Sequence, residues 1–364
     1  MRTKSFILTF LMMMFCSVSF GQTSKWGIPD THCESTMTMI TQIVVDGTIQ
    51  GADVEIAAFC GDELRGTVRP DETQMNMVYL VIHGNIPTAG DPAEVISFRF
   101  YDHSAGRELF YPYPDIVFED NKKIGDIEFL NTQTGIYAGD NLINFTSIAE
   151  VNNVKYGSLQ AAVNAAQAGE TVTLLDDAIG AGVVIDKNVI IDFGGKTYTI
   201  NQAVGSAGTE TLGFQILKNK TVTLNNGTLT STAAVEGSKE VKMLIQNYAH
   251  LTLNKMDLVD NTDHILYALS NNSGNVNLVG NTNITTDEVA FDVYDYSSAG
   301  YEVPTVNVNT TGIIDGAIEV SESISNNLNI SGGKFTKELQ LAWCADGYIP
   351  TTEVIDETTY YTVK

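Results

Sequence analysis

Apolar residues recur in pairs along the second half of the chain, and one polar residue separates the two members of most pairs. Residues two apart on a strand point to the same side, so each pair indicates a strand with one buried face. The same offset in five successive segments favours strands stacked in register over an antiparallel barrel. The pairs are Val222/Leu224, Leu251/Leu253, Val276/Leu278, Val306/Val308 and Leu328/Ile330.

A third apolar residue follows each pair after a short polar corner, and a further strand, such as Phe291–Tyr294, precedes it. Three strands in each unit of roughly 22 to 30 residues predict the coil of a three-sided parallel β-helix. One coil cannot bury its own apolar residues, so neighbouring coils about 4.8 Å away must cover them. The third residues are Leu229, Leu258, Ile284, Ile313 and Phe335.

The first and last units of such a stack need a cover. Ser158 is a suitable helix N-cap and Gly169 a suitable stop, so we expect a capping helix at about 158–168. We place the β-helix over 149–364, with a terminal cap at about 340–364.

Short apolar strands with turn signals between them, such as Asp46-Gly47, predict an antiparallel β-sandwich over 22–148. Composition changes near residue 150, because all five arginines and six of the eight prolines precede it. The expected fold class is therefore all-β, with two domains.

The first residues predict a secretory signal peptide over 1–21. Arg2 and Lys4 precede an apolar run over 6–20, which is too short to span a bilayer comfortably. No other segment is apolar enough for a transmembrane span. The chain carries 20 basic and 44 acidic side chains, a net charge of −24, and loss of the two basic residues makes it −26. Such a chain repels phosphate backbones, so we expect no nucleic-acid partner.

Three cysteines remain outside the predicted signal peptide. Cys33 and Cys60 lie in one module and are the candidates for a disulfide, which an oxidising compartment would allow. Cys344 is then left over and fits a small buried apolar residue.

Two stretches carry a resemblance to known families. Trp26, Val54–Gly66 and Ile96–Asp102 resemble a β-sandwich module at the front of exported Bacteroidetes proteins. Residues 157–177, 185–197 and 330–350 resemble right-handed, pectate-lyase-like β-helix surface proteins of gut bacteria. These resemblances imply a secreted protein of the cell surface or periplasm of a Gram-negative bacterium.

Enzymes with the pectate-lyase-like fold use catalytic residues that this chain lacks. Pectate lyases use an arginine or lysine base beside calcium, and no arginine follows Arg107. Of the motifs of polygalacturonase-like hydrolases, only Asn261-Thr-Asp263 is matched. The sequence therefore assigns no catalytic residue.

One outer face carries the candidate binding site. Inward-facing residues on the strand 291–294 leave Asp292 and Tyr294 on the outside, and the same alternation places Tyr267 one coil earlier and Glu319 one coil later. Aromatic rings pack on the C–H faces of sugars, and carboxylates accept hydrogen bonds from hydroxyl groups. The column Tyr267, Asp292, Tyr294, Glu319 is thus a candidate glycan site, although an ordinary solvated face has the same composition.

A second line of acids follows the corners of the coils. Asp263, Asp287 and Asp315 are weak calcium candidates there. We expect no cofactor, with calcium as the one ion to be considered.

Two classes of function stay open. The lack of a catalytic set favours a non-catalytic binding or adhesion protein whose partner is a glycan or a surface protein. The alternative is a polysaccharide lyase or glycoside hydrolase that uses Asp292 and Glu319.

Overall fold

The structure is a computed structural model, and it describes residues 24–88, 90–104, 106–109, 113–206, 210–262 and 264–364. The predicted signal peptide, residues 1–21, lies outside the described residues. Strands make up 51% of the chain and helices 8%, which confirms the all-β class. Within the described residues, no helix is long and apolar enough to cross a membrane.

The chain divides into two compact units. Among the described residues, the first takes its members from 24–42, 51–107 and 115–141, and the second from 43–50, 108–114 and 142–364. A single boundary near residue 148 therefore does not describe this division. The segment 43–50 belongs with the second unit because β2 pairs in parallel with β13, and Ser147 N donates to Asp46 Oδ1 at 2.7 Å.

The first unit is built on two sheets. In one, β1 pairs with β6 antiparallel and with β10 parallel, and in the other β4 lies between β5 and β7, antiparallel to both. The strands that precede residue 149 are β1 (Ser35–Thr41), β2 (Ile43–Val45), β3 (Thr48–Ile49), β4 (Val54–Cys60), β5 (Glu63–Val68), β6 (Val78–Gly84), β7 (Val95–Asp102), β8 (Arg107–Leu109), β9 (Ile116–Val117), β10 (Lys123–Ile124), β11 (Leu130–Asn131), β12 (Ile136–Tyr137) and β13 (Ile143–Phe145). The 3₁₀ helices η1 (Glu72–Gln74) and η2 (Ile127–Phe129) lie between them.

Cys33 and Cys60 are free in the structure, so the disulfide predicted between them is not formed there. The Cys33 sulfur instead accepts from Nη1 of the buried Arg65 at 2.7 Å. Arg65 Nη2 also donates to Glu63 and to Glu94, at 2.9 and 2.8 Å. In the structure, Cys33 therefore contacts a guanidinium group.

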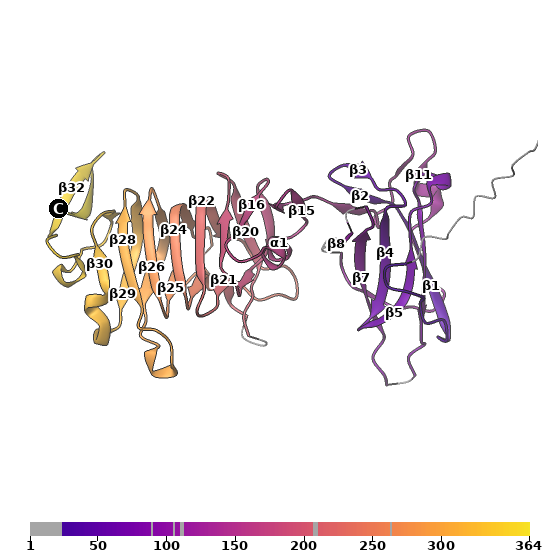
Figure 1. Cartoon of the computed structure of the whole chain (residues 1–364), viewed down its shortest axis with the longest axis horizontal. Coiled ribbons are helices and arrows are strands. Elements are labelled where there is room, and N and C mark those ends of the chain that lie inside the picture. Colours follow the sequence, from indigo (N-terminus) through magenta and orange to yellow (C-terminus); the bar gives the residue numbers. More distant parts are fainter. Residues whose placement is uncertain (1–23, 89, 105, 110–112, 207–209, 263) are drawn as a thin grey trace, which may run out of the picture. The chain divides into compact units, whose positions relative to one another are not determined.

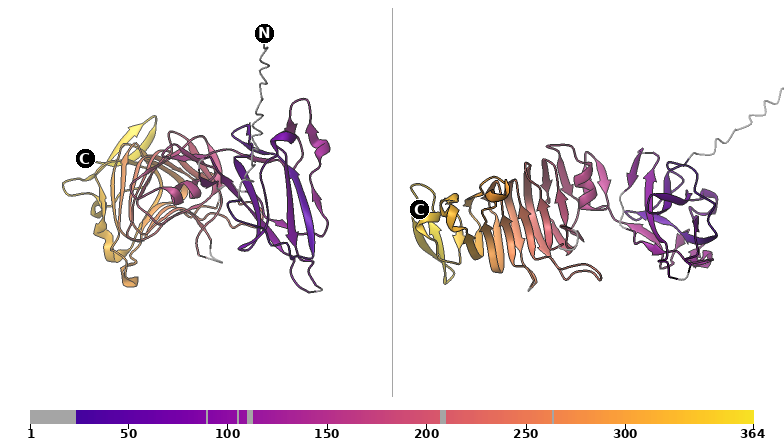
Figure 2. Two further views of the ribbon diagram at one scale, coloured as in Figure 1. Left: turned by 45° about the vertical axis from the view of Figure 1, so that its right-hand side comes forward. Right: turned by 90° about the horizontal axis from the view of Figure 1, so that it is seen from below.

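Residues 149–364 of the second unit form one sheet of twenty strands, most of them paired in parallel, beside the small sheet of β2, β3 and β13. Each strand pairs with the equivalent strand of the next turn of chain, and Figures 1 and 2 show these strands in a single stack. The strands are β14 (Ala149–Val151), β15 (Val154–Tyr156), β16 (Thr171–Leu174), β17 (Ala178–Ala181), β18 (Val183–Ile185), β19 (Val189–Asp192), β20 (Thr197–Gln202), β21 (Leu212–Ile216), β22 (Thr221–Ser231), β23 (Met243–Asn247), β24 (His250–Val259), β25 (Tyr267–Asn271), β26 (Asn275–Gly280), β27 (Asn283–Val293), β28 (Thr305–Thr310), β29 (Ile313–Val320), β30 (Leu328–Ile330), β31 (Lys334–Phe335), β32 (Pro350–Ile355) and β33 (Thr358–Val363). The helices are α1 (Leu159–Ala165), η3 (Ser297–Ala299), η4 (Glu322–Asn327) and η5 (Leu341–Trp343).

The apolar columns predicted from the sequence are confirmed by this register. Leu224 pairs with Leu253, Leu253 with Leu278, Leu278 with Val308 and Val308 with Ile330, and all five are fully buried. The third column holds one correction, because Ile284 pairs with Ile314 and not with Ile313. The corner before β29 is one residue longer than predicted, so Ile314 faces inward.

Both ends of the stack are covered. At the first end, Ser158 Oγ accepts from Ala161 N at 3.2 Å and caps α1, whose Leu159, Ala162 and Val163 are fully buried. The helix ends at Ala165, three residues before the predicted end. At the far end, Trp343 and Leu339 are buried, and the β32–β33 hairpin packs Tyr361 against the same core (yellow in Figure 1).

Candidate functional site

The outer face of β23, β25, β27 and β29 carries a column of polar side chains. Gln246 pairs with Ser270, Ser270 with Asp292 and Asp292 with Glu319. The neighbouring positions Phe291 and Val293 are fully buried, so Asp292 faces outward, as predicted. Since parallel strands lie about 4.8 Å apart, Asp292 and Glu319 occupy adjacent steps of the same column.

Tyr267 does not occupy the predicted step. It pairs with Val289, and Ser270 is the residue beside Asp292. The register prediction was wrong by three residues because the buried inward position after Leu269 is Asn271, a polar residue. Asn271 Oδ1 accepts from Nδ2 of the equally buried Asn247 at 2.9 Å, so the interior contains an amide pair where the pattern called for aliphatic residues.

Tyr267 nevertheless lies close to the acidic pair, since the negative charges of Glu319 and Asp292 both act on its hydroxyl group. Partial burial raises the pKa of Tyr267, and the negative charges of Glu319 and Asp292 raise it further. Tyr267 thus belongs to the site through the length of its side chain and not through its register.

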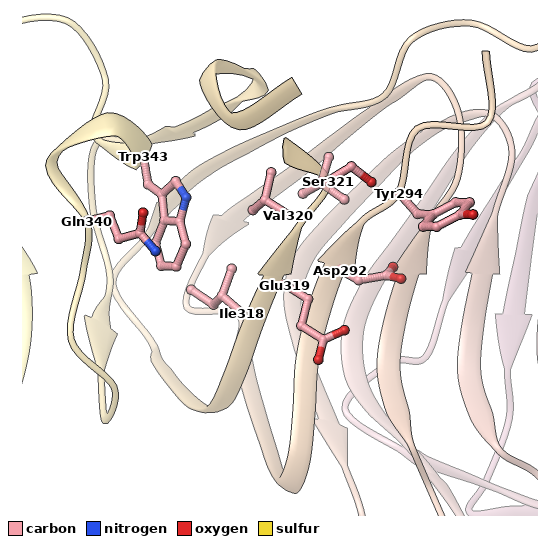
Figure 3. A pocket seen from close by; sticks show the side chains of 9 residues that line it. Asp292, Tyr294, Ile318, Glu319, Val320, Ser321, Gln340 and Trp343 are labelled. Atoms are coloured by element: carbon pink, nitrogen blue, oxygen red, sulfur yellow. The ribbon is translucent and has the colours of Figure 1, made fainter. Parts of the chain in front are cut away.

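Asp292 and Glu319 line an open pocket of about 450 Å³. The other residues that line it are Val293, Tyr294, Ile318, Val320, Ser321, Gln340 and Trp343 (Figure 3). Figure 3 shows the Tyr294 ring beside Asp292, while Trp343 and Gln340 come from the terminal segment on the opposite side. The pocket therefore joins two carboxyl groups and two aromatic rings.

The pocket exists because the last turn of the stack is incomplete. Ile318–Val320 of β29 pairs with β27 on one side, and on the other side the described residues contain no strand that pairs with it. The corresponding segment after β31 instead forms η5, which places Gln340 and Trp343 across a gap. An unpaired strand edge and an indole ring thus form two sides of one depression.

Asp292 has an unusual environment for a carboxyl group. Burial raises its pKa to about 6 and the negative charge of Glu319 adds to this, while hydrogen bonds from the Ser270 side chain and from Asn271 N, the latter at 3.0 Å, lower it. Among the described residues, neither Asp292 nor Glu319 forms an ion pair with a lysine, arginine or histidine. The pocket therefore holds negative charge that no side chain nearby balances.

A cluster of four tyrosines continues from the pocket. Tyr294 lies 6.0 Å from Tyr296, and Tyr296 lies 5.5 Å from Tyr301 and 6.3 Å from Tyr248, measured between ring centroids. The loop that carries η3, orange in Figure 1, brings Tyr296 and Tyr301 back to Tyr248. Tyr248 was not predicted, since its place two turns before Tyr294 depends on this loop.

The weak calcium candidates are Asp263, Asp287 and Asp315. Asp263 lies outside the described residues, Asp287 is exposed, and Asp315 accepts a hydrogen bond from Thr336 Oγ1 at 2.7 Å. In the part of the chain that the structure describes, no group of three or more His, Cys, Asp or Glu residues gathers at metal-binding distance.

Trp343 and Gln340 were missing from the predicted site. Trp343 is one of only two tryptophans in the chain and had been placed in the terminal cap, where it lies. Its rarity is the one sequence signal that could have drawn attention to it, because tryptophan is enriched at binding surfaces.

Comparisons with protein-family models, curated proteins and solved structures returned no match for this chain.

Proposed function

We propose that this chain is an exported, non-catalytic carbohydrate-binding protein of the cell surface or periplasm, and that the pocket at Asp292, Glu319, Tyr294 and Trp343 is its binding site. The observation that carries the proposal is the meeting of two aromatic rings and two carboxyl groups in one open pocket of about 450 Å³. Rings cover the apolar C–H faces of a sugar, and carboxylates accept hydrogen bonds from its hydroxyl groups.

The architecture that we propose is a right-handed parallel β-helix over 149–364, similar to pectate-lyase-like surface proteins, behind a β-sandwich over 22–148. The parallel register, with matching buried residues on successive turns, supports the first part. The antiparallel pairings of β4 with β5 and β7 support the second. A rigid stack suits a binding role, because it holds the two carboxyl groups at a fixed spacing without cost at the moment of binding.

Export rests on the sequence of residues 1–21, with two basic residues before an apolar run. Expression in a Gram-negative host, followed by N-terminal sequencing of the mature protein, tests it. A chain that keeps Met1 and stays in the cytoplasm would contradict the export proposal and leave the binding proposal to its own test.

A glycan array with the purified protein tests binding directly. We expect retention of one class of glycan, and loss of that signal on Tyr294→Ala, because the Tyr294 side chain is 51% exposed and its removal leaves the core intact. Tyr348→Ala is the matched control, since Tyr348 is 39% exposed but does not line the pocket. Equal loss of the glycan signal with both variants, or loss with neither, would refute the proposed site.

A glycoside hydrolase is the second candidate, and one observation favours it. Asp292, with a pKa raised to about 6, stands beside Glu319, and hydrolases pair an acid of raised pKa with a second carboxylate. New reducing ends without unsaturation after incubation with polysaccharides, abolished by Asp292→Asn and Glu319→Gln, would replace the binding proposal with this one.

A further inference from the structure

The pocket contains two acids and no cation. Asp292 and Glu319 lie on adjacent strands and both line it, while the seven other lining residues are apolar or neutral. The protein as a whole carries a net charge of −24, so no distant excess of positive charge offsets the pair. A ligand that brings a positive charge would therefore gain an attraction that a neutral one lacks.

The aromatic walls suit the same kind of ligand. Trp343 and Tyr294 lie on opposite sides of the two carboxyl groups (Figure 3), and the faces of such rings attract a cationic amine as well as C–H groups. The protein already shows this contact nearby, where Lys218 Nζ lies 5.5 Å from the centroid of the Tyr301 ring.

A metal ion fits the pocket less well than an amine. Calcium takes six to eight oxygen ligands, and the described residues gather no third acid at Asp292 and Glu319. An ammonium group needs only a few acceptors, and the two carboxyl groups supply them.

We propose that the ligand of this pocket is an amino sugar whose protonated amine lies between Asp292 and Glu319, with its ring against Trp343 and Tyr294. This inference rests on the proposed function and adds the chemical class of the sugar. It also separates the site from acidic polysaccharides, which the same carboxylates repel.

Three tetrasaccharides with the same β-1,4 backbone test the inference by calorimetry. They are the tetramers of glucosamine, of N-acetylglucosamine and of glucose, which differ only at the second carbon. At about pH 6.5 most of the Asp292 carboxyl is ionised and a large share of the sugar amines is protonated. We expect the glucosamine tetramer to bind about tenfold more tightly than the other two.

Variants separate the amine contact from general sugar binding. Glu319→Gln and Asp292→Asn should each reduce the preference for the glucosamine tetramer while keeping the weaker binding of the glucose tetramer. Asp287→Asn, which removes an exposed acid of the same strand outside the pocket, should leave the preference unchanged. The preference should also decline as the pH falls below about 6, because Asp292 then becomes neutral.

The outcomes distinguish this inference from the proposed function. Equal affinity for all three tetramers, lost on Tyr294→Ala, would overturn the amine contact and leave carbohydrate binding standing. A preference that survives both acid substitutions would also overturn it. If none of the three binds, the inference fails, and the glycan array then decides the proposed function alone.

Discussion

Asp292 lies half-buried without a cation beside it, and the substitution Asp292→Asn removes its charge with little change of shape. Asn271 N donates to Asp292 Oδ1 at 3.0 Å, and the amide oxygen of asparagine can accept the same hydrogen bond. The variant thus isolates the cost of keeping a carboxylate in this position. We expect it to be more stable than the parent protein at neutral pH.

The size of the gain follows from the pKa. Folding raises the pKa of Asp292 from 3.8 to about 6, mainly through burial. Each pH unit between these values corresponds to about 1.4 kcal/mol, so the ionised carboxyl lowers the free energy of unfolding by about 3 kcal/mol at neutral pH. Below about pH 3 the carboxyl is protonated in both states, and this cost vanishes.

The direction of the Asp292 pKa shift fixes the pH range in which the stability changes. Between about pH 4 and 6 the folded chain holds the proton that the unfolded chain has released, so the contribution of Asp292 to stability falls as the pH rises. The difference between Asp292→Asn and the parent should therefore be near zero at about pH 3 and reach its full value above about pH 7.

Urea unfolding followed by Trp343 fluorescence measures this difference. The other tryptophan, Trp26, packs edge-on against Phe59 in the first unit, so a Trp26→Phe background leaves Trp343 as the reporter of the second unit. Asp287→Asn serves as the control for the loss of one negative charge. A pH slope between 4 and 6 that is the same in Asp292→Asn as in the parent would refute the reasoning.

Three further substitutions test the stack, each by the same urea titration. Leu253→Ala should lower the free energy of unfolding by about 2–5 kcal/mol because Leu253 is fully buried between Leu224 and Leu278; a loss under about 1 kcal/mol would contradict the continuous core. Lys255→Gly should raise the free energy of unfolding by about 0.5–1 kcal/mol, because Lys255 is exposed and has a φ of 55°, which strains any residue but glycine. A destabilised variant would count against backbone strain at this corner. Ser158→Ala should cost about 1 kcal/mol through loss of the α1 cap, and an unchanged midpoint would show that the cap contributes nothing.

The aliphatic columns could be predicted from the sequence because their cause is local and repeated. Side chains alternate along a strand, and in a parallel stack each residue meets its equivalent on the next turn. Leu224, Leu253 and Leu278 follow this rule, and their pairing was confirmed. The cap of α1 was equally local, since Ser158 and the buried Leu159 and Val163 lie within six residues of one another.

The errors arose where polar residues occupy the interior. The aliphatic pattern assigns inward positions to apolar residues, but Asn247 and Asn271 are fully buried. Asn247 Nδ2 donates to Asn271 Oδ1, and backbone groups bond to Asn247 Oδ1 and Asn271 Nδ2. When a polar pair can occupy inward positions, the alternation of apolar residues no longer fixes the register of β25. The prediction therefore placed Tyr267 beside Asp292, whereas its partner is Val289, three residues earlier. Buried amides in a stack are thus compatible with the fold only because each turn supplies the partner of the next.

The pocket itself could not have been predicted from the repeat, because it lies where the repeat stops. A complete further turn would have paired a strand with Ile318–Val320 and covered Asp292 and Glu319 from one side. The chain instead leaves that strand edge unpaired and forms η5. Trp343 of η5 then lines the same pocket as two acids of earlier turns, Asp292 and Glu319. The same irregularity that ends the stack therefore makes the outer face concave around Asp292 and Glu319. A concave, charged and aromatic surface at a fixed spacing is what selective binding of a small sugar requires.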